Sequence, residues 1–271
     1  MSDEVAVVCS KADPASLNIA EHLLALVEWD FIGDYWSYAD FRLIIHEYRQ
    51  ITLKSIDKRL FSLELNPSMI IFASKHKSKS EVPWLGGHFT GEFENGKINL
   101  ATAAPSGLRS FLQNISVNAP DGYRVSAEAT HHGPTDVETP CFFAEIGSSE
   151  RQWCDLGAGE VVSKAILALQ NPELPIFLGF GGGHYMERQT SLMLNSDIAF
   201  GHLFPNYQVN EISYELVKRA KEKSGAEYAY IDRKSFKAHE RDKVIGIIEE
   251  IGLPILRSKE IRRRFPLSMK G

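Results

Sequence analysis

Two adjacent histidines stand at a turn that is rich in titratable groups. The stretch EATHHGPTD, residues 128–136, ends an apolar run with His131 and His132, and a Gly-Pro break follows directly. A carboxylate lies on each side of the pair. Histidine nitrogens and carboxylate oxygens suit zinc, and an open coordination position on that ion activates water for hydrolysis. This turn is therefore a candidate metal-binding and catalytic site.

A second candidate site is a histidine that follows three consecutive glycines. In PIFLGFGGGHY an apolar strand pattern ends in Gly181, Gly182 and Gly183, and His184 comes directly after them. Glycines let the backbone approach a ligand closely and expose N–H groups to an anion or a developing oxyanion. The sequence thus places His184 beside a potential anion-binding turn.

A third histidine cluster, with another Gly-Gly-His sequence, lies earlier in the chain, within WLGGHFTGEF at residues 84–93. It contains His88 and Thr90, and it follows the basic run KHKSKS at residues 75–80. One histidine near a strand end is more often structural than catalytic. Here the pattern of strand, glycine and histidine recurs, and Glu145 lies on an intervening strand, which favours one shared site.

Several better-known motifs are missing. GFGGG at residues 179–183 is neither the dinucleotide-binding GxGxxG nor a P-loop, because no GK[ST] follows. The chain has no GxSxG elbow, and the HEY at residues 46–48 lacks the second histidine of HExxH. These observations disfavour a nucleotide-binding fold and a serine hydrolase, and the histidine spacing matches no recognised zinc signature.

The elements that must position these residues alternate along the chain. Apolar runs predict strands over residues 4–10, 41–48, 69–74, 123–130, 141–147, 175–180 and 226–232. Helical periodicity predicts helices over residues 16–29, 108–119, 159–170, 188–195, 212–224 and 241–252. Because parallel neighbours need crossover connections, this alternation favours an α/β fold with a mostly parallel or mixed sheet and helices on both faces. No linker or repeat divides the chain, so we expect one α/β domain over residues 1–271.

Composition limits the class of protein. The 271 residues are 44% hydrophobic and 24% charged, which is ordinary globular material. The net charge of −5 argues against attraction to nucleic acid over the whole surface, although a basic face can coexist with it. Three cysteines without a CxxC pair suit a reduced compartment, and we find neither a signal peptide nor a membrane span. We expect a soluble, cytoplasmic protein.

Several stretches together resemble one family, the D-aminoacyl-tRNA deacylase of the archaeal and plant type, which is unrelated in fold to the small bacterial and animal enzyme. The stretches cover nearly the whole chain: FASKHKSKS, HFTG, EATHHGPT, FFAEIGSSERQW, GFGGGHY and YAYIDRKSF. EATHHGPT and GGGHY are specific in combination. The sequence departs from the family pattern at Glu92, where the family usually has asparagine.

The resemblance implies hydrolysis of the ester that joins a D-amino acid to the 3′ end of tRNA, with dependence on Zn²⁺. It also implies a core similar to the phosphorylase and peptidyl-tRNA hydrolase folds, and it implies no obligate protein partner. From the chemistry that ester hydrolysis needs, we predict that the metal ligands are His88, His131, His132, Glu145 and His184. We predict as catalytic groups His132, His184 and the N–H groups of Gly182 and Gly183, which would bind the oxyanion or the terminal ribose. The residues that would contact the tRNA are Thr90, Lys75, Lys77, Lys79, Arg262, Arg263 and Arg264, with the basic ones on phosphates.

Two alternatives stay open on the residues alone. A metal-assisted hydrolase or phosphorylase of a small molecule needs the same sheet and histidines but not the basic runs. A non-catalytic RNA-binding module needs the basic runs, with histidines that are only structural. Hydrolysis of D- and L-aminoacyl-tRNA, with and without a chelator, separates the three possibilities.

Overall fold

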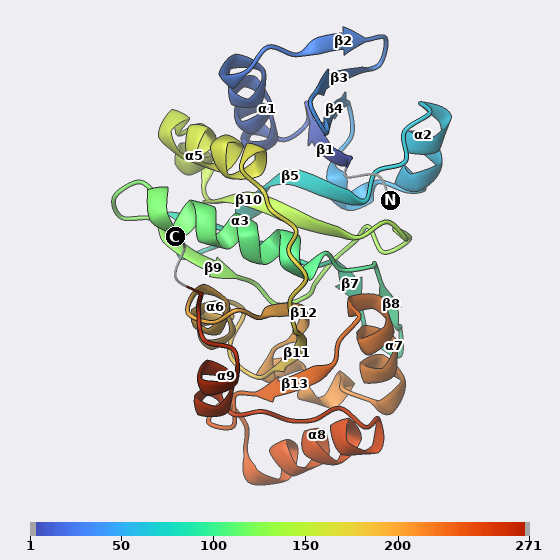
Figure 1. The fold of residues 1–271 in the computed structure, drawn as a ribbon, viewed down its shortest axis with the longest axis vertical. Helices are drawn as coiled ribbons and strands as arrows, with labels where there is room; N and C mark the ends of the chain where they lie inside the picture. The colour runs from blue at the N-terminus through green and yellow to red at the C-terminus, as the bar shows by residue number, and fades with distance from the viewer. Residues whose placement is uncertain (1–3, 269–271) are drawn as a thin grey trace.

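The computed structural model describes residues 4–268, which form two main sheets and a short third one (Figure 1). The large sheet has the strand order β2-β3-β4-β1-β5-β10-β6-β9. Its strands are β1 (Val5–Ser10), β2 (Asp30–Ile32), β3 (Tyr35–Tyr38), β4 (Phe41–His46), β5 (Met69–Lys77), β6 (Trp84–His88), β9 (Arg124–Ala127) and β10 (Cys141–Ser148). The small sheet has the order β12 (Ala199–Phe204), β11 (Ile176–Phe180), β13 (Tyr228–Ile231), and the short sheet pairs β7 (Gly91–Glu92) with β8 (Asn99–Leu100).

Helices follow most of the strands. The α-helices are α1 (Pro14–Leu26), α2 (Ile56–Ser62), α3 (Pro105–Asn118), α4 (Glu150–Trp153), α5 (Leu156–Leu167), α6 (Glu187–Leu194), α7 (Tyr214–Ser224), α8 (Ala238–Glu250) and α9 (Ser258–Arg264). Two 3₁₀ helices span Gln50–Thr52 and Asn206–Glu211. The start of α1 follows from its sequence, since the Asp13 carboxylate accepts a hydrogen bond from the Ser16 N–H at 3.1 Å and Pro14 takes the first helical position.

The middle of the large sheet is parallel and buried on both faces. β1 pairs in parallel with β4 and β5, β5 with β10, and β6 with β9, whereas β6 joins β10 antiparallel. Successive side chains of β1 enter opposite cores: Val5, Val7 and Cys9 belong to one, Ala6 and Val8 to the other. An apolar run without polar alternation is what a doubly covered parallel strand requires.

Helices cover both faces of this sheet, although unequally. Leu23 of α1 and Val162 of α5 pack into one core, which α3 also borders. Ile56 and Leu60 of α2 pack into the core on the opposite face. The prediction of an α/β fold with a mostly parallel or mixed sheet and helices on both faces is therefore confirmed.

The small sheet lies below the large one in Figure 1, and α3 crosses the lower strands of the large sheet in this view. The three strands of the small sheet are all parallel. α3 contacts β6 and β9 of the large sheet and β12 of the small sheet, so this one helix packs against both sheets. α7 and α8 cover the other face, where Leu216 and Val244 pack with Phe180.

The sequence patterns missed β6, because two glycines interrupt its apolar run. The structure shows why side chains are excluded there. A Cβ at Gly86 would lie 1.9 Å from the Ser126 carbonyl oxygen, and one at Gly87 would lie 2.2 Å from that of Phe143. The glycines therefore let β6 sit tightly between β9 and β10, and they bring His88 to the end of a buried strand.

The three cysteines are unpaired, with Cys9 and Cys141 buried and Cys154 exposed. Burial raises the pKa of the Cys9 and Cys141 thiols to about 12, so both serve as apolar core groups. Within residues 4–268, no helix is both long and apolar enough to cross a membrane.

Candidate metal centre

One short segment after β9 links the two main sheets. We predicted a strand over residues 123–130, but β9 ends at Ala127 because the chain then leaves the large sheet. Glu128 N–H still donates to the Gly87 carbonyl at 3.0 Å, Ala129 N–H donates to His184 at 2.9 Å, and Thr130 N–H donates to Leu203 of β12 at 2.9 Å. The segment thereby carries its histidines to the junction between the sheets.

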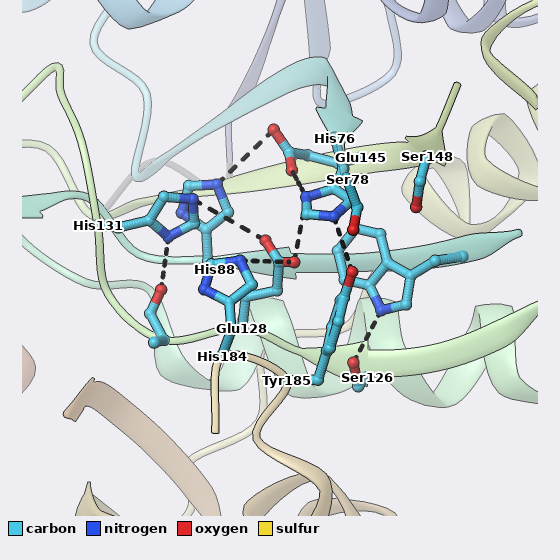
Figure 2. A network of polar contacts seen from close by, with 12 residues as sticks. His76, Ser78, His88, Ser126, Glu128, His131, Glu145, Ser148, His184 and Tyr185 are labelled. Atoms are coloured by element: carbon cyan, nitrogen blue, oxygen red, sulfur yellow. Dashed lines mark hydrogen bonds and ion pairs between the residues drawn. The ribbon is translucent and has the colours of Figure 1, made fainter. Parts of the chain in front are cut away.

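Five histidines and two glutamates converge at this junction (Figure 2). They come from five segments that are far apart in the chain. Three groups have ligand atoms within 4.8 Å of one another: His88, His131 and His132; His76, Glu128 and His184; His88, Glu128 and Glu145. Each group has the composition and spacing of a metal-binding site.

Three of the imidazoles are held in the tautomer that a metal ligand needs. The Nδ1 atom of His88 lies 3.0 Å from the Phe89 carbonyl, that of His131 lies 2.7 Å from Ala129, and that of His132 lies 2.6 Å from Gly133. Because a carbonyl oxygen only accepts, each Nδ1 carries the proton and each Nε2 keeps its lone pair. His88 Nε2 is buried without a hydrogen-bond partner among the described residues.

Each of the two glutamates has one oxygen on either side of the cluster. Glu128 Oε1 lies 3.1 Å from His76 Nδ1 and 3.2 Å from His184 Nε2, while its Oε2 lies 4.0 Å from His131 Nε2. Both Glu128 oxygens are buried, and within residues 4–268 neither makes a contact with the angles of a hydrogen bond. Glu145 Oε1 lies 3.7 Å from His88 Nε2 and its Oε2 lies 3.9 Å from His76 Nδ1. Buried carboxylate and imidazole atoms without hydrogen bonds fit a bound cation.

Burial sets the charge of this cluster. It lowers the pKa of His88 and His131 to about 4 and that of His132 to about 3, and in His131 and His132 the neighbouring His88 adds to the shift. Burial alone would raise the pKa of Glu128, but contacts with His184 and His76 outweigh it and hold that pKa below its usual value. Burial and the charge of Glu128 raise the pKa of Glu145. The neutral states of His88, His131 and His132 are those that metal binding requires. Burial alone would lower the pKa of His76, but contact with Glu128 outweighs it and raises that pKa, so a bound cation would have to displace the His76 proton.

The metal-free protein is expected to lose stability steeply as the pH falls below neutral. His88 and His202 are fully buried, and burial lowers the pKa of each from 6.5 to about 4. Above pH 6.5 neither the folded nor the unfolded chain binds a proton at these histidines, and the free energy of unfolding is not reduced. Between pH 6.5 and about 4 only the unfolded chain binds it, so each histidine lowers the free energy of unfolding by about 1.4 kcal/mol per pH unit as the pH falls. Thermal unfolding of the metal-free protein at neutral pH and at about pH 5 measures this slope. An exposed-site variant, His239→Gln, should show the wild-type slope, and a melting temperature unaffected by pH would contradict the assignment.

Aromatic residues orient His76 from the opposite side of the cluster. Its Nε2 lies 3.0 Å from the Tyr185 hydroxyl, and the Trp84 ring lies 4.7 Å from its ring, centre to centre. Trp84 is fixed in turn, since its Nε1–H donates to Ser126 Oγ at 2.8 Å. These contacts direct His76 Nδ1 towards Glu128.

The structure brings together all five metal ligands proposed from the sequence, and it adds two residues that the sequence analysis missed. The five are His88, His131, His132, Glu145 and His184. His76 was missed because it lies inside the basic run KHKSKS, and Glu128 because it lies in an apolar strand pattern. Strand alternation was the available indication: on β5 a buried His76 stands between Lys75 and Lys77, which point to the other face.

Two predicted site groups have structural partners instead. The Gly182 N–H donates to Ser235 Oγ at 2.9 Å, so it is not free to bind an oxyanion in this conformation. Thr90 is fully buried and its hydroxyl donates to the Pro134 carbonyl at 2.6 Å, so it does not reach the surface in this conformation, and its predicted contact with tRNA stays a prediction. Thr90 fastens the loop that carries the adjacent histidines. Gly183 is exposed, and its predicted role stays a prediction.

The basic residues are divided between two places. Lys77 and Lys79 are exposed at the end of β5, next to His76, whereas the Lys75 ammonium lies 4.7 Å from the centre of the Trp153 ring. Arg262, Arg263 and Arg264 are exposed on α9.

The α9 arginines lie away from the glycine turn. The Arg264 guanidinium packs 5.1 Å from the ring centre of Tyr228, at the start of β13. Tyr228 pairs with Phe177 in the first half of β11, while the glycine turn follows the last residue of β11, Phe180. Since β11 and β13 are parallel, Arg264 and the glycine turn lie at opposite ends of the small sheet.

Comparison with known proteins gives consistent results. The family model for D-aminoacyl-tRNA deacylase matches residues 63–256. The chain is 44% identical over 263 residues to the D-aminoacyl-tRNA deacylase of Methanothrix thermoacetophila. The aligned residues cover 96% of this chain and 98% of the relative. It is 42% identical over 286 residues to the D-aminoacyl-tRNA deacylase of Methanosarcina mazei, and the alignment covers 98% of this chain and 96% of that relative.

A crystal structure of a conserved protein of unknown function has the same fold, with a TM-score of 0.89 at 30% identity over 99% of this chain and 100% of the other. The resemblance seen in the sequence is thus confirmed by a family model and by relatives of nearly equal length. This chain belongs to the D-aminoacyl-tRNA deacylase family.

Proposed function

We propose that this protein hydrolyses the ester bond between a D-amino acid and the 3′ end of tRNA, and that the histidine and glutamate cluster is its active site. The observation that carries the proposal is the convergence of seven ligand-type side chains at one junction. The names of the relatives, matched over nearly their whole length, supply the substrate. Because tRNA is charged in the cytoplasm, we place the protein there.

The donor set fits zinc, and its arrangement fits two ions. Imidazole nitrogens and carboxylate oxygens are ordinary zinc ligands. One ion would be held by His88, His131 and His132, and the other by His76 and His184, with Glu128 and Glu145 reaching both. Bound zinc supplies Lewis-acid polarisation of the ester carbonyl and makes a water molecule more acidic.

Three side chains of the cluster have distinct roles in the proposed reaction. Glu128, ionised and central, fixes the two histidine groups relative to each other. Glu145 would act as a ligand, and because its pKa is raised in the metal-free protein, a bound cation would have to displace the proton from this carboxyl. His184 is the most accessible histidine of its group, with 34% of its side chain exposed, so it is suited to meet the substrate at the entrance.

The direct test compares D-tyrosyl-tRNA with L-tyrosyl-tRNA. The wild-type protein should release tyrosine from the D-ester much faster than from the L-ester, a chelator should abolish turnover, and added Zn²⁺ should restore it. Turnover that survives complete removal of metal would refute the metal centre. Binding of tRNA without hydrolysis would favour the RNA-binding alternative instead.

The lysines beside His76 are expected to supply the electrostatic part of tRNA affinity. Replacing Lys77 and Lys79 together with alanine should reduce the slope of log affinity against log salt by about 1.4 to 1.8, because each phosphate contact contributes about 0.7 to 0.9. The matched control is the double variant Arg262→Ala, Arg263→Ala, whose residues are exposed on α9. If the control flattens the slope and the lysine variant does not, tRNA binds at the α9 end.

A further inference from the structure

Two cavities reach the cluster from different ends. In Figure 2, His131 lies at one end of the network and Tyr185 and Ser126 at the other, with the two glutamates between them. One cavity, of about 280 Å³, is lined by His131 and His132. The other, of about 490 Å³, is lined by Tyr185 and Ser126. If the ester of the substrate lies at the cluster, one cavity is available for the amino acid and the other for the terminal nucleotide of the tRNA.

The larger cavity has apolar walls and polar corners. The apolar residues of its lining are Val82, Trp84, Val125 and Tyr185, and the polar and charged ones are Ser80, Arg124, Ser126 and Glu187. It adjoins the cluster directly, because the rings of Trp84 and Tyr185 lie 4.7 and 5.7 Å from that of His76, centre to centre. Arg124 and Ser126 are two residues apart on an edge strand, so they share the face that Trp84 contacts.

The two cavities differ in charge. The larger one has one basic and one acidic residue in its lining, Arg124 and Glu187, so their formal charges cancel. The smaller one contains Glu92 and Glu94, with Lys97 paired to Glu92 at 3.3 Å, and is acidic on balance. An aminoacyl-tRNA end has phosphates on one side of the ester and an α-ammonium group on the other. The acidic lining of the smaller cavity therefore matches the ammonium group of the amino acid, which leaves the larger cavity, with Arg124, for the nucleotide.

We propose that the cavity between Trp84, Tyr185 and Val82 binds the terminal adenosine of the tRNA, with its base against the Tyr185 ring. This inference rests on the proposed function. The base is one ribose away from the ester, so its pocket must adjoin the reacting centre, as this cavity does through His76. Ser126 O–H is able to donate and the Glu187 carboxylate to accept, which matches the ring nitrogens and the amino group of adenine. Arg124 is then placed to meet a phosphate.

The test measures kcat/KM for small esters, with D-tyrosyl-tRNA as the reference substrate. Wild-type protein should hydrolyse 3′-O-D-tyrosyl adenosine at least about tenfold more efficiently than D-tyrosine ethyl ester, in keeping with the stacking of a base on an aromatic side chain. Val82→Trp, which fills the cavity, should remove this base advantage. The ratio of kcat/KM for D-tyrosyl adenosine to kcat/KM for D-alanyl adenosine should be the same in Val82→Trp as in the wild-type protein. Ser80→Trp fills the same cavity from its rim and serves if Val82→Trp folds poorly, and Val27→Trp, in a separate cavity, is the matched control.

The outcomes separate this inference from the proposed function. If wild-type protein hydrolyses D-tyrosyl-tRNA but gains nothing from the adenosine, or if the base advantage survives in both filled variants, the adenosine assignment is wrong. If the filled variants instead change the ratio of D-tyrosyl to D-alanyl esters and keep the base advantage, the cavity holds the amino-acid side chain. Failure to hydrolyse any D-aminoacyl ester would refute the proposed function itself.

Discussion

Replacing Glu128 with glutamine is expected to lower kcat for D-tyrosyl-tRNA by more than about 100-fold and to reduce the zinc content of the protein, since losing even an indirect partner of a metal ligand typically costs about 10- to 100-fold. Glu128 is fully buried, and its two oxygens face His76 and His184 on one side and His131 on the other. An amide of the same size removes the negative charge and directs an NH₂ group at the imidazoles. The measurements are kcat and zinc bound per protein molecule.

The control for this variant is Glu160→Gln, an exposed glutamate on α5 that should keep wild-type kcat and zinc content. Unfolding by heat establishes whether the Glu128→Gln protein is folded. A folded Glu128→Gln protein with normal zinc content and turnover would remove Glu128 from the active site.

Substitutions of His76 and of its neighbour Lys77 should change different kinetic constants. His76→Ala is expected to lower kcat by about 100-fold or more, because it removes a ligand-type nitrogen next to both glutamates. Lys77→Ala is expected to raise KM at moderate salt and leave kcat unchanged, since an exposed lysine at the strand end contributes to tRNA binding alone. Steady-state kinetics of both variants on D-tyrosyl-tRNA give the comparison.

The same comparison tests whether the run KHKSKS has one role or two. If His76→Ala only raises KM, His76 belongs with the lysines as part of a basic surface. Zinc content gives an independent measure, because it should fall in His76→Ala and stay normal in Lys77→Ala.

Much of the fold follows from local patterns. The apolar run of β1 forms a strand within the range that we predicted, residues 4–10. The helix that we predicted over residues 16–29 forms as α1, but it begins earlier, at Pro14 after the Asp13 N-cap, and ends at Leu26. β6 was not predictable in this way, because its glycines are required by contacts with β9 and β10 that arise only in the folded sheet.

The site was predictable to the extent that its residues stand out in sequence. His131, His132 and His184 lie beside glycine turns, and such turns at strand ends are where α/β folds place ligands. His76 and Glu128 depend on which face of a strand is buried and on where β9 ends, and tertiary contacts decide both. The partners of Thr90 and Gly182 are equally non-local: the Pro134 carbonyl and the Ser235 hydroxyl.

The central claim is that the junction between the two sheets is a metal-dependent ester-hydrolysing centre. Its most direct test is the titration of metal-free wild-type protein with Zn²⁺, with bound zinc and D-tyrosyl-tRNA hydrolysis measured on the same samples. Hydrolysis should be absent without metal, rise with the zinc bound and level off when both ligand groups are filled. Full turnover by the metal-free protein, or zinc uptake without any gain in turnover, would contradict it.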